Sequence, residues 1–146
     1  MPGGTPEAHG RGREMSTLRG GPASSAWEDL VARIRNPKGE VSIGIVGKYV
    51  DLRESYKSLH EALVHGGLGN EVQVALTYID SERVEREGPA GLLSHLHGIL
   101  VPGGFGTRGI EGKIKAIQYA REKRIPYFGI CLGMQLMGTA FGGKVV

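Results

Sequence analysis

Short apolar runs alternate with amphipathic stretches along most of this chain. Four runs are rich in β-branched and aromatic residues, a composition that predicts buried strands. They span residues 41–47, 71–80, 98–106 and 125–130, the third running into a glycine loop. Each run is short enough to be one strand of a compact sheet.

Between these runs, apolar residues recur at the spacing of a helix face. Three stretches show this pattern: residues 26–37, 55–67 and 110–123. Pro37 should end the first helix, and Gly66 should stop the second. The polar stretch 81–96 predicts a mixture of loop and helix.

Alternating strands and helices favour a parallel α/β sheet with helices on both faces, the layering of flavodoxin-like folds. Ligands of such sheets bind just beyond the carboxyl ends of the strands. Two glycine-rich stretches, 102–106 and 129–133, follow predicted strands at such ends. We therefore expect the functional site to lie between them.

The pattern divides the chain into three parts. Residues 1–24 contain too few apolar residues to bury and read as a disordered tail. Residues 25–40 form a helix and linker, and residues 41–146 form the α/β domain. Because only four strands can be counted, we expect an incomplete sheet.

Composition and charge narrow the class of protein. The chain has 146 residues, 40% hydrophobic and 23% charged, with a net charge of +3 and no dense basic run. We therefore expect no nucleic-acid partner, and the lack of a long apolar stretch argues against a membrane partner. A single cysteine cannot form an internal disulfide, so the default compartment is the reducing cytoplasm.

The single cysteine stands in the most informative motif, Gly-Ile-Cys-Leu-Gly at 129–133. This spacing is that of a nucleophile elbow, with cysteine in place of serine. A tight turn from strand to helix crowds the positions two before and two after Cys131, and glycine removes that clash. The helix N-terminus would stabilise the thiolate. The alternative is a buried structural cysteine beside helix-packing glycines.

The loop "VPGGFG" at 101–106 strengthens the case for a nucleophile. Acyl transfer needs an oxyanion hole, for which the backbone N–H groups of Leu132 and Gly104 are candidates. The alternative is an ordinary glycine loop. His95 and His97 could suggest a metal, but two ligands are too few, and we expect a surface or core role.

The stretch "PGGFGTRGIEGKIKAIQYAREKRIPYFGICLGMQ" closely resembles the glutaminase part of the CTP synthase family. Class I glutamine amidotransferases in general share a looser form of it, and "FGTRGIEGK" narrows the match. "IGIVGKYVDLRESYKSLHEALVHGG" resembles the start of the same domain. The resemblance covers about residues 40 to 137 and implies a class I glutamine amidotransferase-like fold.

The resemblance implies an enzyme that hydrolyses L-glutamine and supplies ammonia for ATP-dependent amination of UTP to CTP in pyrimidine nucleotide biosynthesis. Its site residues would be Cys131 as nucleophile, Gly104 and the stretch Leu132, Gly133, Met134 and Gln135 as the glutamine site, and Arg108, Gly109 and Glu111 as a lid loop linked to activation by GTP. Without the family, Glu111 reads as an ordinary acidic residue in a first helical turn.

The partners and cofactors implied by the family lie largely outside this chain. The full-length family enzyme is a tetramer whose separate synthase domain uses ATP and magnesium. We expect no cofactor in this chain itself. In the family, a catalytic His and Glu lie far downstream of the cysteine, whereas all five histidines here precede Cys131. The ending "LMGTAFGGKVV" also departs from the family, which suggests truncation or a frame shift after the nucleophile helix.

Three functions compete on this sequence. The first is the glutaminase domain of a CTP synthase, inactive as this isolated chain because the catalytic His and Glu are missing. The second is a non-catalytic fragment that binds glutamine or a partner subunit. The third is another thiol enzyme of similar architecture, such as a peptidase-like relative, which would leave "FGTRGIEGK" unexplained.

Overall fold

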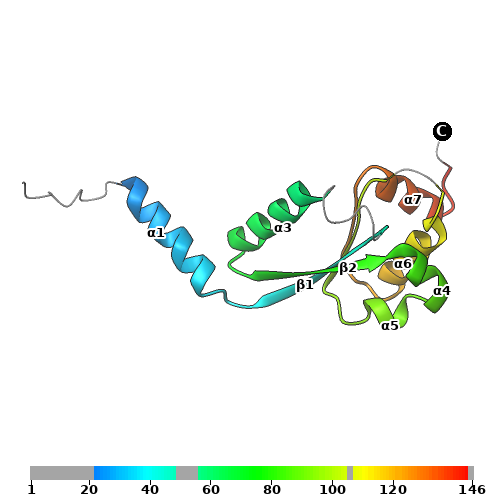
Figure 1. Ribbon diagram of the computed structural model, residues 1–146, viewed down its shortest axis with the longest axis horizontal. Coiled ribbons are helices and arrows are strands. Elements are labelled where there is room, and N and C mark those ends of the chain that lie inside the picture. The colour runs from blue at the N-terminus through cyan, green and yellow to red at the C-terminus, as the bar shows by residue number, and fades with distance from the viewer. Residues whose placement is uncertain (1–21, 49–55, 105–106, 145–146) are drawn as a thin grey trace, which may run out of the picture.

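The computed structural model describes residues 22–48, 56–104 and 107–144. Within them one sheet has four parallel strands in the order β2–β1–β3–β4. The strands are β1 (Glu40–Gly47), β2 (Gln73–Asp80), β3 (Gly98–Val101) and β4 (Tyr127–Gly129). The predicted parallel α/β fold is confirmed (Figure 1).

The strand register brings the two glycine-rich stretches together. Ile99 pairs with Tyr127 and Val101 pairs with Gly129, so β3 and β4 end level with each other. The loop that begins at Pro102 and the turn that contains Cys131 therefore leave the sheet side by side. The predicted meeting of these stretches is confirmed.

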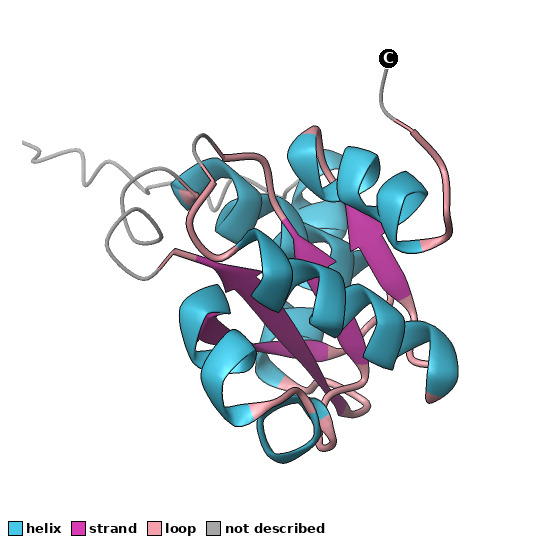
Figure 2. Ribbon diagram, turned by 90° about the vertical axis from the view of Figure 1, so that its right-hand side faces the viewer, coloured by secondary structure: helices cyan, strands magenta, loops and turns pink. Residues whose placement is uncertain are grey.

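Helices connect the strands and cover the sheet on both sides (Figure 2). The described helices are α1 (Pro22–Arg35), α3 (Lys57–Gly69), α4 (Ser81–Glu87), α5 (Ala90–Leu93), α6 (Ile110–Glu122) and α7 (Leu132–Ala140). In Figure 1, α1 extends away from the other elements, beyond the end of α3.

Alternate strand residues feed two apolar clusters. Val46, Ile99 and Val101 face the larger cluster, which α4, α5, α6 and α7 cover with residues such as Val84 and Ile117. Ile45 and Leu100 point to the opposite face, where the side chains of α3 pack. This alternation follows from the two-residue period of a strand.

Part of the second face is uncovered by the described residues. An apolar groove there is lined by Ile43, Leu63, Gly98, Ile99, Leu100, Pro126, Tyr127 and Phe128. Phe128 is 64% exposed although it lies within β4. The cover supplied by α3 therefore reaches β1 and β2 but leaves β4 open on this side.

Several boundaries differ from those predicted. The first helix begins at Pro22, inside the stretch expected to be tail, while residues 1–21 lie outside the described residues. Gly66 does not stop α3, which continues to Gly69. The side chain of Asn70 donates to the Gly66 carbonyl at 2.8 Å, and this contact helps to end the helix. The polar stretch 81–96 forms α4 and α5.

No described helix combines the length and apolarity needed to cross a bilayer.

Candidate functional site

Cys131 stands at the turn from β4 into α7 with an unusual backbone conformation. Its φ is 50° and its ψ is −109°. Residues other than glycine rarely adopt a positive φ. Such a conformation costs about 1–3 kcal/mol and persists only where its surroundings impose it. The thiol is free and exposed. These features match a nucleophile elbow and exclude the alternative of a buried structural cysteine.

The two glycines that flank Cys131 are required by close backbone contacts. A Cβ on Gly129 would lie 2.5 Å from the carbonyl carbon of Gly133 and 2.6 Å from the nitrogen of Met134. A Cβ on Gly133 would overlap the carbonyl oxygen of Val101. The clash predicted from the spacing is therefore present at both positions.

Hydrogen bonds fix the elbow between β3, β4 and α7. The Ile130 amide donates to the Val101 carbonyl at 3.0 Å, and the Gln135 amide donates to the Cys131 carbonyl at 3.0 Å. The Tyr127 hydroxyl donates to the Gly133 carbonyl at 2.7 Å. Burial raises the pKa of Tyr127 well above its usual range, so this hydroxyl stays a donor at every physiological pH.

The loop after β3 lies beside Cys131. A Cβ on Gly103 would lie 3.3 Å from the Cβ of Cys131 and 3.8 Å from its Sγ. The Tyr56 hydroxyl, just before α3, donates to the Gly103 carbonyl at 2.5 Å. Gly104, the predicted oxyanion donor, follows directly and is exposed. Phe105 and Gly106 lie outside the described residues.

Lys113 is a buried cation behind this loop. It stands on α6, is only 4% exposed, and its Nζ would lie 3.4 Å from a Cβ on Gly104. Burial, together with the charge of Lys48, lowers the pKa of Lys113. Sequence reasoning missed this lysine, although it falls on the same helical face as the buried residues Ala116 and Ile117.

The residues predicted to bind glutamine lie around the first turn of α7. Leu132 is half-buried and Gly133 is buried, whereas Met134 and Gln135 are exposed. Gln135 lies in the first turn of α7, and its backbone amide donates to the Cys131 carbonyl at 3.0 Å. The structure thus brings this stretch together with Cys131 and the loop at Gly103 and Gly104.

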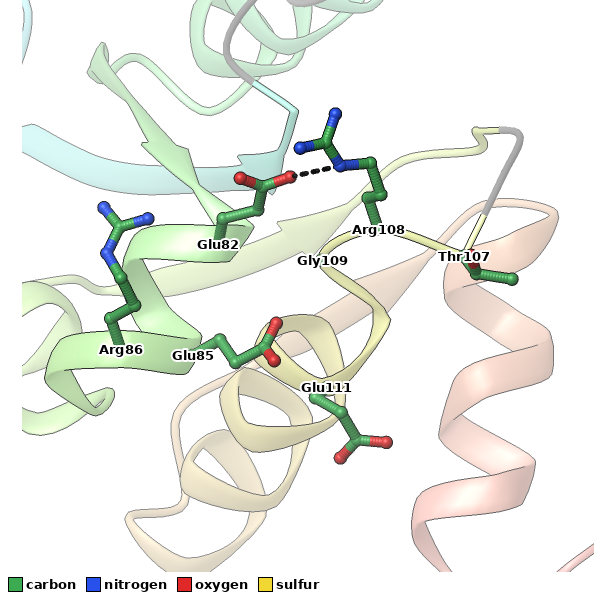
Figure 3. A pocket seen from close by; sticks show the side chains of 7 residues that line it. All are labelled: Glu82, Glu85, Arg86, Thr107, Arg108, Gly109 and Glu111. Atoms are coloured by element: carbon green, nitrogen blue, oxygen red, sulfur yellow. Dashed lines mark ion pairs between the residues drawn. The ribbon is translucent and has the colours of Figure 1, made fainter.

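The predicted lid residues line a separate pocket of about 400 Å³ between α4 and the start of α6 (Figure 3). Its lining residues are Glu82, Glu85, Arg86, Thr107, Arg108, Gly109 and Glu111. The Nε of Arg108 lies 3.5 Å from a carboxylate oxygen of Glu82, as the dashed line in Figure 3 marks. Gly109 precedes α6 with φ 77°, and Glu111 occupies the first turn.

The pair of histidines at 95 and 97 has a structural role in part. Both side chains are exposed, and the Nδ1 of His97 accepts a hydrogen bond from the Ser42 amide at 2.9 Å. Both precede β3 and so lie at the edge of the sheet opposite to Cys131. No three metal-ligating side chains cluster anywhere in residues 22–48, 56–104 and 107–144.

Comparison with known proteins adds to this geometry. The family model for "Glutamine amidotransferase class-I" matches residues 51–146, well over half of the chain. The chain belongs to the class-I glutamine amidotransferase family. Both the turn that contains Cys131 and the loop at Gly103 and Gly104 lie within the matched residues.

The chain is similar to bacterial CTP synthases. The chain is 63% identical over 125 residues to that of Geobacter metallireducens, covering 85% of this chain and 23% of the relative. It is 62% identical over 120 residues to that of Desulfotalea psychrophila, covering 82% and 22%. This amidotransferase chain thus spans less than a quarter of the length of the relatives it matches.

A solved structure shows a similar fold. The "Trypanosoma brucei CTPS - glutaminase domain with bound acivicin" superposes with a TM-score of 0.65 at 40% sequence identity. The match covers 70% of this chain and 40% of the trypanosomal chain. The amidotransferase chain therefore corresponds to part of a CTP synthase glutaminase domain.

Proposed function

We propose that this chain is the Cys131-bearing part of a CTP synthase glutaminase that hydrolyses glutamine and releases ammonia. The observation that carries the proposal is the strained backbone of Cys131, held against the glycine loop at Gly103. An exposed thiol at a helix N-terminus, beside flexible amides, suits attack on an amide carbonyl. Similarity to CTP synthases supports glutamine as the amide.

In the proposed reaction the Cys131 sulfur attacks the side-chain carbonyl carbon of glutamine. A C–S bond forms, and the N–H groups of Leu132 and Gly104 stabilise the negative oxygen of the tetrahedral intermediate. The C–N bond then breaks, and the nitrogen takes up a proton as ammonia leaves. Water hydrolyses the resulting thioester, which releases glutamate and restores the thiol.

The remaining roles follow from the same family resemblance. Leu132, Gly133, Met134 and Gln135 bind glutamine, and the acid that protonates the ammonia is a histidine located after this segment in the family. The ammonia serves ATP- and magnesium-dependent amination of UTP in a synthase domain of a tetrameric enzyme. Arg108, Gly109 and Glu111 form a lid that responds to GTP, and their shared pocket supports this role.

The test uses a full-length enzyme that carries this chain's residues. An alkylating glutamine analogue should label Cys131 and abolish glutamine-dependent CTP formation, with ammonia-dependent formation retained. The control is Cys131→Ala, which should resist labelling and leave only background turnover of glutamine. Labelling that persists in Cys131→Ala, or undiminished glutamine turnover by it, would refute the assignment of the nucleophile.

A further inference from the structure

We propose that Tyr56 is a positioning residue that sets the direction of the Gly104 N–H. The proposal rests on the proposed function, in which that N–H stabilises the oxyanion. Tyr56 lies immediately before α3 and packs in the apolar cluster on the α3 face of the sheet. Its hydroxyl donates to the carbonyl of Gly103, 47 residues away, at 2.5 Å.

One hydrogen bond on this carbonyl orients the whole peptide group. The amide that joins Gly103 to Gly104 is planar, and in a trans amide the C=O and N–H point in opposite directions. When the Tyr56 hydroxyl holds the Gly103 oxygen, the Gly104 N–H must point away from Tyr56. The hydroxyl therefore controls a donor that it never touches.

The position needs such control because both residues are glycines. Without side chains, Gly103 and Gly104 can rotate their shared peptide plane at little steric cost. Cys131 lies beside Gly103, and Lys113 lies beside Gly104. Among the described residues, the Tyr56 hydroxyl is the donor that fixes the Gly103 oxygen.

The decisive variant is Tyr56→Phe in a full-length enzyme that carries these residues. The change keeps the aromatic ring in its cluster and removes only the hydroxyl. We expect glutamine-dependent kcat to fall roughly five- to tenfold, because one net hydrogen bond shifts an equilibrium by that factor. The KM for glutamine and ammonia-dependent CTP formation should stay unchanged.

The matched control is Tyr78→Phe. Tyr78 packs in the same cluster, but its hydroxyl lies 3.3 Å from the Nδ1 of His60 and away from the glycine loop. This variant should keep its kcat within about twofold, since it removes a similar hydroxyl without freeing the peptide. An equal loss in both variants would mean a general packing effect and would overturn the proposal.

Binding of a transition-state mimic gives a second measurement. The γ-aldehyde analogue of glutamine adds to the Cys131 thiol and forms a hemithioacetal with a tetrahedral carbon. The oxygen on that carbon needs the same N–H donors. Its affinity should weaken in Tyr56→Phe by about the same factor as kcat, while the rate of iodoacetamide alkylation stays unchanged. Unchanged aldehyde affinity, or a rise in KM at constant kcat, would overturn the proposal.

A pH profile tests the role in a protein whose packing is intact. Difluorotyrosine at position 56 keeps the hydroxyl, but its phenol ionises closer to neutral pH and then cannot donate. Relative to wild type, glutamine-dependent kcat should be normal at low pH and fall as pH rises. A profile parallel to wild type overturns the role of Tyr56. A wild-type enzyme without any glutamine-dependent activity would instead overturn the proposed function.

Discussion

Gly104 is exposed, yet a Cβ added there would meet Lys113. Such a Cβ would lie 3.4 Å from the Nζ of Lys113. In the proposed mechanism, the branches of a larger side chain would also enter the space of the substrate carbonyl. Under the proposed mechanism, this position supplies a backbone donor and tolerates no large side chain. Because Gly104 is exposed, a substitution there should affect glutamine turnover more than stability.

We expect Gly104→Val in the full-length enzyme to lower glutamine-dependent turnover roughly 10²- to 10³-fold, the usual cost of losing one oxyanion donor. Ammonia-dependent CTP formation should survive. The control is Gly39→Val, since a Cβ on Gly39 has no atom within 4 Å and the residue lies far from the site, before β1. Normal glutamine turnover by Gly104→Val would remove Gly104 from the mechanism.

Lys113 gives a prediction with a defined pH dependence. Its lowered pKa means that the unfolded chain binds more protons at this amine than the folded chain does, between the lowered pKa and the ordinary value of 10.5. Stability from this group therefore rises with pH across that window. Replacing Lys113 with an uncharged residue should raise the free energy of unfolding most at neutral pH, where the buried ammonium opposes folding.

We expect Lys113→Met to raise the free energy of unfolding by on the order of 1 kcal/mol near pH 7. The gain should shrink as pH approaches 10.5. Thermal or urea unfolding of the full-length protein at several pH values measures it, with the exposed Lys123→Met as control, expected to change stability by less than about 0.5 kcal/mol. A gain that grows with pH would contradict this account.

At single positions the sequence revealed the thiol and its glycines but not their neighbours. Cys131, Gly129 and Gly133 stand within five residues, so a local steric rule connects them. Tyr56 reaches the loop from just before α3 and Lys113 reaches it from α6, so their contacts depend on where the sheet places those helices. No local pattern records such a distance.

Among the elements, the order of strands and helices was predictable because burial on alternate or helical faces repeats along the sequence. The ends were not. Gly66 looked like a helix stop, yet α3 continues to Gly69. A Cβ on Gly67 would lie 2.8 Å from the Val72 carbonyl oxygen, so that glycine serves packing against the following strand. Glycine marks both a helix end and a close contact, and only the fold distinguishes them.

The contact between α4 and α6 depends on another such glycine. A Cβ on Gly112 would overlap the Ser81 carbonyl oxygen and lie 3.1 Å from the Glu85 nitrogen. Gly66, in contrast, would place its Cβ in open space on α3. The two glycines are therefore a matched pair that separates helix propensity from packing.

We expect Gly66→Ala to stabilise the protein by roughly 0.5–1 kcal/mol, because alanine favours the helix. Gly112→Ala should destabilise it by roughly 1–3 kcal/mol, since the backbone of α4 must move away. Unfolding measurements on the two variants, with hydrogen exchange of the α4 and α6 amides, test both signs. Stabilisation by Gly112→Ala would mean that the two helices do not pack as described.

For the whole molecule, the places of His60 and His97 bear on the acid that the proposed reaction needs. His97 lies at the edge of the sheet opposite to Cys131, bonded to the Ser42 amide. His60 lies beside Tyr78 of β2, and two strands separate β2 from β4. We therefore expect neither to protonate ammonia leaving from the thiol site.

We therefore expect the purified 146-residue chain to release ammonia from glutamine no faster than its Cys131→Ala variant. The open groove at Phe128 should also make the chain prone to self-association, which sedimentation would reveal. A clear cysteine-dependent rate would show that an upstream histidine or a second chain supplies the acid.

Because Cys131 has a positive φ, selection for stability and selection for the thiol favour different residues at this position. Glycine accepts that backbone freely, so Cys131→Gly would relieve about 1–3 kcal/mol of strain while deleting the thiol. A single base change converts either cysteine codon into a glycine codon. Laboratory evolution for heat tolerance alone would thus find the better-folded, inert protein within one mutational step, and any screen for stabilised variants must keep glutamine use under selection throughout.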